Sequence, residues 1–152
     1  MRLATIVPAL FLYSASVWAA DPFVGTWKLN VEKSDFGSGP KAKSGNTTYE
    51  AKGDGYMYTS ETVFGEDTVA RLGGPVLFDG TVTEGGLNGR AVTYISKKID
   101  ANNYEVILTD KETGKVSHTF RYSVSSEDKT LSFTWFSSGD EKPVLKFIYD
   151  KS

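Results

Sequence analysis

The sequence predicts a single all-β domain, an up-and-down antiparallel β-barrel of about eight to ten strands. Apolar and polar residues alternate with a period of two over most of the chain, and no window longer than ten residues has helical periodicity. Short polar turns separate the alternating runs, so consecutive strands are expected to be antiparallel neighbours. A sheet with this many strands protects its edges most simply by curling into a barrel.

The chain begins with the pattern of a secretory signal peptide. Arg2 is followed by the apolar run Leu3–Tyr13 and then by smaller residues up to Ala20. Val17 and Ala19 satisfy the small-residue rule for cleavage after Ala19, and cleavage after Ala20 is the alternative.

This pattern divides the chain into a leader, residues 1–20, and a mature barrel domain, residues 21–152. A retained membrane anchor is the other interpretation, but Pro8 interrupts a stretch that is only just long enough to span. We therefore expect an exported protein, periplasmic or secreted, with no membrane span once the leader is removed.

Charge and composition exclude several classes of function. Without Arg2, 16 Lys and Arg residues oppose 19 Asp and Glu residues, a formal charge of −3, and the basic residues are scattered. Such a chain has no general attraction for phosphate backbones, so no nucleic-acid partner is expected. The chain contains no Cys, which rules out disulfides and thiolate metal sites. The mature length suits one domain, expected to be a monomer.

The first half of the mature chain contains five expected strands. An Asp-Gly turn at Asp54 between alternating apolar residues predicts a hairpin. Residues 31–45, rich in Lys, Ser, Gly and Pro, are expected to form a loop across one end of the barrel. The glycine-rich segments 73–75 and 85–89 are interpreted as turns. The expected strands are residues 23–30, 47–52, 56–64, 68–72 and 76–83.

The second half contains five more strands with shorter connections. On the strand around Phe120, the alternation places His118 and Tyr122 on the same face and Arg121 on the other. The last strand is apolar on both faces, so we expect residues 23–30 or 31–45 to cover its outer side. The expected strands are residues 90–99, 104–109, 115–124, 130–137 and 144–150.

The opening strand contains Gly25-Thr26-Trp27, and Lys33-Ser34 and Phe36 follow it. A Gly-x-Trp near the mature N-terminus, ahead of an antiparallel meander, resembles the lipocalin and fatty-acid-binding (calycin) superfamily, and more narrowly small secreted bacterial lipocalin-like proteins. In lipocalins a basic residue of a late strand packs on that Trp. The resemblance therefore implies structural roles for Gly25 and Trp27, with Lys146 or Arg121 as the basic partner. We expect Trp27 to be buried and to plug one end of the barrel.

A barrel of this size encloses either a packed core or a cavity for one small ligand. Aromatic side chains are the candidates for an apolar lining with hydroxyl groups, and Arg121, Lys146 and Lys98 are the candidates for meeting a ligand carboxylate if any of them points inward. His118 is the only histidine, so a multi-histidine metal site is excluded, and on an apolar face it is interpreted as a core residue. The candidate lining residues are Tyr49, Tyr58, Phe78, Tyr94, His118, Phe120, Tyr122, Phe133, Trp135 and Arg121.

Three functions remain open from the sequence. The first is an exported barrel that holds a largely apolar, lipid-like or aromatic ligand, which enters at the end of the barrel formed by the two glycine-rich segments. The second is a barrel without a cavity that acts as an interaction or envelope-structure protein. The third is a lipocalin-like isomerase or cyclase using His118 or a lumen tyrosine, although no nucleophile motif accompanies the histidine. No cofactor or metal is expected, and no catalytic residue is assigned.

Overall fold

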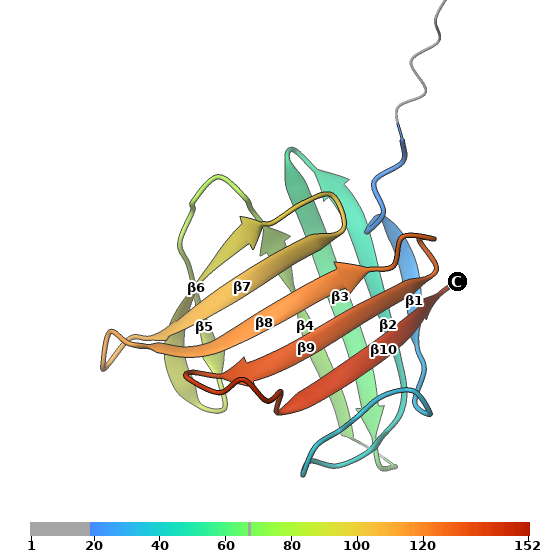
Figure 1. Cartoon of the computed structure of the whole chain (residues 1–152). Coiled ribbons are helices and arrows are strands. Elements are labelled where there is room, and N and C mark those ends of the chain that lie inside the picture. Colours follow the sequence, from blue (N-terminus) through green and yellow to red (C-terminus); the bar gives the residue numbers. More distant parts are fainter. Residues whose placement is uncertain (1–18, 67) are drawn as a thin grey trace, which may run out of the picture.

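The computed structural model describes residues 19–66 and 68–152, and its secondary structure is entirely β (Figure 1). The expected signal peptide falls almost wholly outside these residues. The prediction of an all-β antiparallel fold with about ten strands is confirmed. The strands are β1 (Gly25–Leu29), β2 (Ala42–Lys52), β3 (Gly55–Phe64), β4 (Thr68–Val76), β5 (Thr83–Leu87), β6 (Arg90–Lys98), β7 (Asn103–Asp110), β8 (Val116–Val124), β9 (Thr130–Ser137) and β10 (Leu145–Lys151).

The ten strands form one strongly curled antiparallel sheet in the order β4-β3-β2-β1-β10-β9-β8-β7-β6-β5. Every strand pairs with its neighbours in the chain, except that β1 pairs with β10 and that β4 and β5 are not paired with each other. The two edges of the sheet are therefore consecutive strands, and the curl brings them to the same side of the molecule (Figure 1). The barrel has a seam between β4 and β5 that no ladder of backbone hydrogen bonds closes.

One end of the barrel is filled by side chains, and we call it the closed end. Trp27 is fully buried there, and its Nε1–H donates to the carbonyl oxygen of Phe23 at 2.9 Å. The ring of Phe23 lies 5.6 Å from that of Tyr49 and 5.0 Å from that of Tyr104, between centroids. The Tyr56 hydroxyl donates to the carboxylate of Asp21 at 2.8 Å. The opening segment thus seals this end, as expected for Trp27.

The basic partner of Trp27 is Lys151, and neither Lys146 nor Arg121 is close to it. The Lys151 Nζ atom lies 5.0 Å from the Trp27 ring centroid, because β10 places Lys151 opposite Trp27 in the register with β1. The backbone of Lys146 instead forms an antiparallel bridge with that of Asp35. Gly25, two residues before Trp27, has a φ of +131°, a conformation that favours glycine.

The loop of residues 30–41 runs along β10 before it crosses to β2. Asp35 and Lys146 exchange two backbone hydrogen bonds of 2.7 and 2.8 Å, so the loop continues the pairing that β1 begins. The Phe36 ring packs 5.1 Å from that of Phe147. The loop therefore extends the edge of β10 and packs Phe36 against a cavity-lining ring; it does not cover the outer side of the strand as expected, and Lys146 is exposed there.

The expected boundaries around the glycines and at the start of β2 were wrong. Residues 73–75 lie inside β4, residues 85–87 lie inside β5, and residues 77–82 form the connecting loop. Glycine was taken as a turn residue, whereas here it lies in edge strands beside a bulky ring from β6. β2 begins at Ala42 because a register shift between Ala42 and Ser44 extends its pairing with β3.

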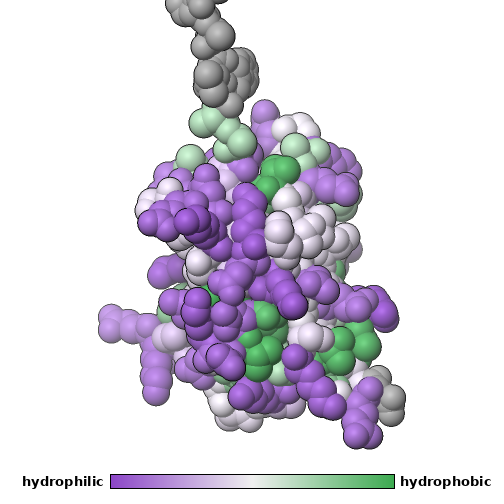
Figure 2. Space-filling model, turned by 90° about the vertical axis from the view of Figure 1, so that its right-hand side faces the viewer, coloured by the Kyte–Doolittle hydropathy of each residue, from purple (hydrophilic) through white to green (hydrophobic). Residues whose placement is uncertain are grey.

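Apolar side chains turn inward over most of the sheet. Seen from the side of β1 and β10, the surface is mainly hydrophilic, with scattered apolar residues toward the lower end (Figure 2). The buried core is concentrated at the closed end, around Phe23 and Trp27. The middle and the opposite end of the barrel interior are not filled, and this is where the candidate site lies.

Candidate ligand-binding site

The interior of the barrel holds a cavity of about 500 Å³. This volume falls within the range of pockets that bind drug-sized ligands. The cavity is lined by inward-facing residues of β2 to β10. Several of the aromatic residues around it, such as Phe120 and Phe133, are only partly buried because one face of each ring meets the hollow.

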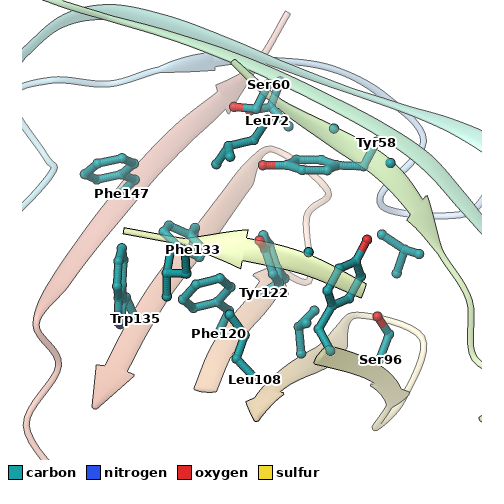
Figure 3. Close-up of a pocket in the computed structure, with 18 of the residues that line it drawn as sticks. Tyr58, Ser60, Leu72, Ser96, Leu108, Phe120, Tyr122, Phe133, Trp135 and Phe147 are labelled. Carbon is teal, nitrogen blue, oxygen red and sulfur yellow. The ribbon is translucent and has the colours of Figure 1, made fainter. Parts of the chain in front are cut away.

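One wall of the cavity is a ladder of aromatic rings from β8, β9 and β10 (Figure 3). The strand register places Phe120 opposite Trp135 and places Phe133 opposite both Tyr122 and Phe147. The ring centroids in these pairs are 5.1, 5.1 and 5.9 Å apart. Such a wall offers a large apolar surface with few rotatable bonds.

Hydroxyl groups gather at the part of the cavity nearest the closed end. The Tyr49 and Tyr104 hydroxyls share a hydrogen bond of 2.8 Å, and those of Thr47 and Ser60 share one of 2.9 Å. All these side chains line the cavity. We call this set the hydroxyl cluster, which comprises Thr47, Tyr49, Tyr58, Ser60, Tyr104, Tyr122 and Tyr149.

The tyrosines of the hydroxyl cluster remain protonated well above neutral pH. Burial raises the pKa of Tyr49, Tyr104 and Tyr122 well above the usual value for the residue. Burial likewise raises the pKa of Tyr149 to about 12. Each hydroxyl can therefore donate one hydrogen bond and accept others, and the cluster has no net charge at physiological pH.

No Lys, Arg or His lines the cavity in the described part of the chain, and Glu84 is the only charged lining residue. Glu84 lies on the edge strand β5, is exposed, and accepts a hydrogen bond of 2.8 Å from Lys111. That interaction lowers the pKa of the Glu84 carboxyl group. The interior is thus apolar with neutral polar groups, and its one ionised group sits at the rim.

The seam between the edge strands is spanned by Tyr94 of β6. A Cβ atom at Gly85 on β5 would lie 3.2 Å from the Tyr94 ring, and one at Gly74 on β4 would lie 3.6 Å from its hydroxyl oxygen. Leu72 of β4 lines the cavity and is 66% exposed, which marks the rim. The glycine-rich segments therefore border the cavity along its side, whereas we expected them at an end of the barrel.

Most of the aromatic residues selected from the sequence face the cavity. The structure brings them together there because each lies on the inward face of its strand, as the alternation indicated for β8 and β9. The residues placed in the lining are Tyr49, Tyr58, Tyr94, Phe120, Tyr122, Phe133 and Trp135.

Phe78, His118 and Arg121 do not line this cavity. Phe78 belongs to the loop after β4, where its ring packs 5.6 Å from that of Tyr104 at the closed end. Arg121 points outward, since it alternates with Tyr122, and it pairs with Glu105 at 3.7 Å. A carboxylate ligand in the cavity cannot meet this guanidinium.

His118 lines a separate small pocket of about 150 Å³. Its Nδ1 atom and the Nε1 atom of Trp135 are buried without a hydrogen-bond partner among the described residues, and the two rings are 5.3 Å apart. Burial lowers the pKa of His118, so its ring is neutral at pH 7. Since His118 has no hydrogen-bonded carboxylate to orient it, the geometry adds no support for its use as a general base.

The sequence analysis missed several lining residues. Tyr104, Val106 and Leu108 alternate on β7, and this pattern was available in the sequence. Thr47, Ser60 and Ser96 had no such signature, because small hydroxyl residues are equally common on outer faces. Their inward orientation depends on the register of β2 with β3 and of β6 with β7.

Within residues 19–66 and 68–152, no group of three or more acidic or histidine side chains is placed to hold a metal ion. In the same residues, no helix is long and apolar enough to cross a membrane.

Comparison with solved structures identifies the class of fold as a fatty-acid-binding-protein-like, calycin-type barrel. A Schistosoma mansoni fatty acid binding protein in complex with arachidonic acid superimposes with a TM-score of 0.65 at 16% identity, over 86% of this chain and 96% of that one. A secretory abundant heat soluble protein from Ramazzottius varieornatus superimposes with a TM-score of 0.62 at 15% identity, over 89% of this chain and 98% of that one. As-p18, an extracellular fatty acid binding protein, superimposes with a TM-score of 0.58 at 17% identity, over 87% of this chain and 97% of that one.

These similarities are similarities of fold. No protein-family model matches the chain, and no curated protein sequence matches it.

Proposed function

We propose that this protein is an exported β-barrel that binds one small, largely apolar molecule in its interior. The observation that carries the proposal is the cavity of about 500 Å³ behind a wall of aromatic rings. A barrel acting only through its surface would gain stability by filling that space, because empty apolar volume destabilises a core. The solved fatty acid binding proteins with this fold, one of them in complex with arachidonic acid, support the same assignment.

The proposal of export is based on the sequence of residues 1–20. The packed domain begins directly after the expected cleavage site: Phe23 is buried and Asp21 is hydrogen-bonded to Tyr56, whereas Ala19 and Ala20 are exposed. Cleavage after Ala19 or Ala20 would therefore leave the buried Phe23 and the hydrogen bond between Asp21 and Tyr56 in place. Expression of the full chain in a bacterium, followed by fractionation and mass measurement, tests this. A chain starting at residue 20 or 21 outside the cytoplasm supports export, and an intact cytoplasmic chain contradicts it.

Binding is tested by titrating the purified mature domain with Nile red, an uncharged fluorescent probe of apolar sites. We expect saturable binding with one site per chain. Val106 faces the hollow opposite Phe120, so Val106→Trp places a bulky ring inside the cavity, and we expect it to weaken binding strongly. Ile107→Trp, on the outer face of the same strand, is the matched control, and we expect this variant to retain Nile red binding. Unsaturable binding, or equal binding by both variants, would show that the cavity is not the site.

A further inference from the structure

The polar groups of the cavity are distributed unevenly along its length. The hydroxyl cluster lies beside the closed end, where Tyr49 and Tyr104 contact Phe23. The part of the cavity away from that end is lined mainly by hydrocarbon, including Phe64, Trp135, Leu145 and Phe147. A long ligand lying along the barrel would therefore meet hydroxyl groups at its inner end and apolar side chains along the remainder.

The basic residues near the barrel are engaged elsewhere. Arg121 pairs with Glu105 and lies over the ring of Phe136, 4.9 Å from its centroid. Lys98 lies over Phe78, and Lys151 lies over Trp27. Within the described residues, no lining side chain is placed to neutralise an anion inside the cavity.

We propose that the cavity selects an uncharged amphiphile, with a hydroxyl, carbonyl or amide group at its inner end, over the matching carboxylate. This inference rests on the proposed binding function and specifies its ligand class. A hydroxyl cluster can donate to a carbonyl oxygen or exchange hydrogen bonds with an alcohol. An ionised carboxylate that entered the cavity would exchange its hydration shell for hydrogen bonds from neutral groups only. Burial of a charge without a counter-charge is costly.

Two members of the hydroxyl cluster are best placed to meet such a group. Tyr58 and Tyr122 are partly exposed and line the cavity, with ring centroids 6.3 Å apart, and their side chains approach from facing walls (Figure 3). Tyr49 and Tyr104 are fully buried and already share a hydrogen bond. The geometry therefore assigns the Tyr58 and Tyr122 hydroxyls as the groups that contact the inner end of the ligand.

The test compares three ligands with the same hydrocarbon chain: oleyl alcohol, oleamide and oleate. Each is used below its aggregation limit at pH 8 to displace Nile red from the mature domain. We expect the alcohol and the amide to displace the probe at concentrations at least about tenfold lower than oleate, a difference of about 1.4 kcal/mol. Equal or stronger displacement by oleate would overturn the inference and leave the binding function intact. Failure of Nile red to bind at all would instead remove the proposed function.

Two variants locate the effect within the cavity. Tyr58→Phe and Tyr122→Phe each remove a hydroxyl and keep the ring. We therefore expect each variant to bind oleyl alcohol more weakly while its binding of Nile red persists. Tyr56→Phe removes a hydroxyl at the closed end, outside the cavity lining, and is the matched control, expected to leave the preference unchanged. A preference for the alcohol that is the same in all three variants would show that the hydroxyl cluster does not produce it.

Discussion

The ammonium group of Lys151 lies over the indole ring of Trp27, 5.0 Å from its centroid, and so joins the last strand to the first. The two residues are opposite each other in the β1–β10 register. This contact connects the segment that seals the closed end to the end of the chain.

Lys151→Met should lower the free energy of unfolding by about 0.5–1 kcal/mol, because it removes the cation–π interaction and keeps an aliphatic chain over the ring. Lys146→Met is the control, since that side chain is exposed, and we expect a change within about 0.5 kcal/mol. Urea unfolding of both variants measures the difference. A larger loss of stability in Lys146→Met than in Lys151→Met would contradict the interaction between Lys151 and Trp27.

The sequence indicated the strands and the Trp27 plug because both depend on local patterns. Strict alternation on β8 and β9 placed Phe120, Tyr122, Phe133 and Trp135 on one face, and that face lines the cavity. Lys151 was missed because its position over Trp27 depends on the pairing of the first strand with the last. Such register is fixed by the curled sheet as a whole and has no local sequence pattern.

The cavity itself was less accessible to sequence analysis. The same aromatic residues would suit a filled barrel or a hollow one, and the difference depends on volumes summed across ten strands. Glycines were assigned to turns on composition, whereas Gly74 and Gly85 make room for the ring and hydroxyl of Tyr94 at the seam. Arg121 was considered for ligand binding on its charge alone, although its alternation with Tyr122 already placed its side chain on the outer face of the barrel.

The hydrogen bond between Tyr49 and Tyr104 gives a second prediction. Tyr49→Phe leaves the buried Tyr104 hydroxyl without this partner, which should cost about 1–3 kcal/mol of stability. In the double variant with Tyr104→Phe both hydroxyls are absent, so the loss should be smaller than the sum of the two single losses. A double-mutant cycle measured by urea unfolding gives the coupling. Strict additivity would mean that the two hydroxyls do not interact.

Stability should fall as the pH rises above about 10. Unfolded tyrosine ionises near pH 10, whereas burial raises the pKa of Tyr149 to about 12 in the fold. Between these values the unfolded chain loses protons that the folded chain keeps, so each such tyrosine removes roughly 1.4 kcal/mol per pH unit. The stabilisation is fully present below pH 10.

Unfolding by urea between pH 8 and 11.5, together with absorbance of tyrosinate, measures this dependence. Tyr149→Phe should reduce the slope. An unchanged slope in that variant, or full ionisation of the tyrosines in the folded protein near pH 10, would contradict the burial of their hydroxyls.

The seam provides a kinetic prediction. Tyr94 spans the space between the edge strands, so Tyr94→Ala should increase both the association and the dissociation rates of Nile red several-fold with a smaller change in affinity. Tyr94→Phe keeps the ring and should exchange the probe at nearly the wild-type rate. Stopped-flow fluorescence measures both variants. Unaltered rates in Tyr94→Ala would mean that ligands pass elsewhere, such as the end of the barrel near Phe36.

The central claim is that the interior of this barrel is a container for one uncharged, largely apolar molecule. Native mass spectrometry of the mature domain, mixed with equal concentrations of oleyl alcohol and oleate, tests it most directly. We expect a single adduct per chain with the mass of the alcohol, and a much weaker adduct signal from the Val106→Trp variant. A spectrum showing only the bare chain, or one dominated by the oleate adduct, would contradict it.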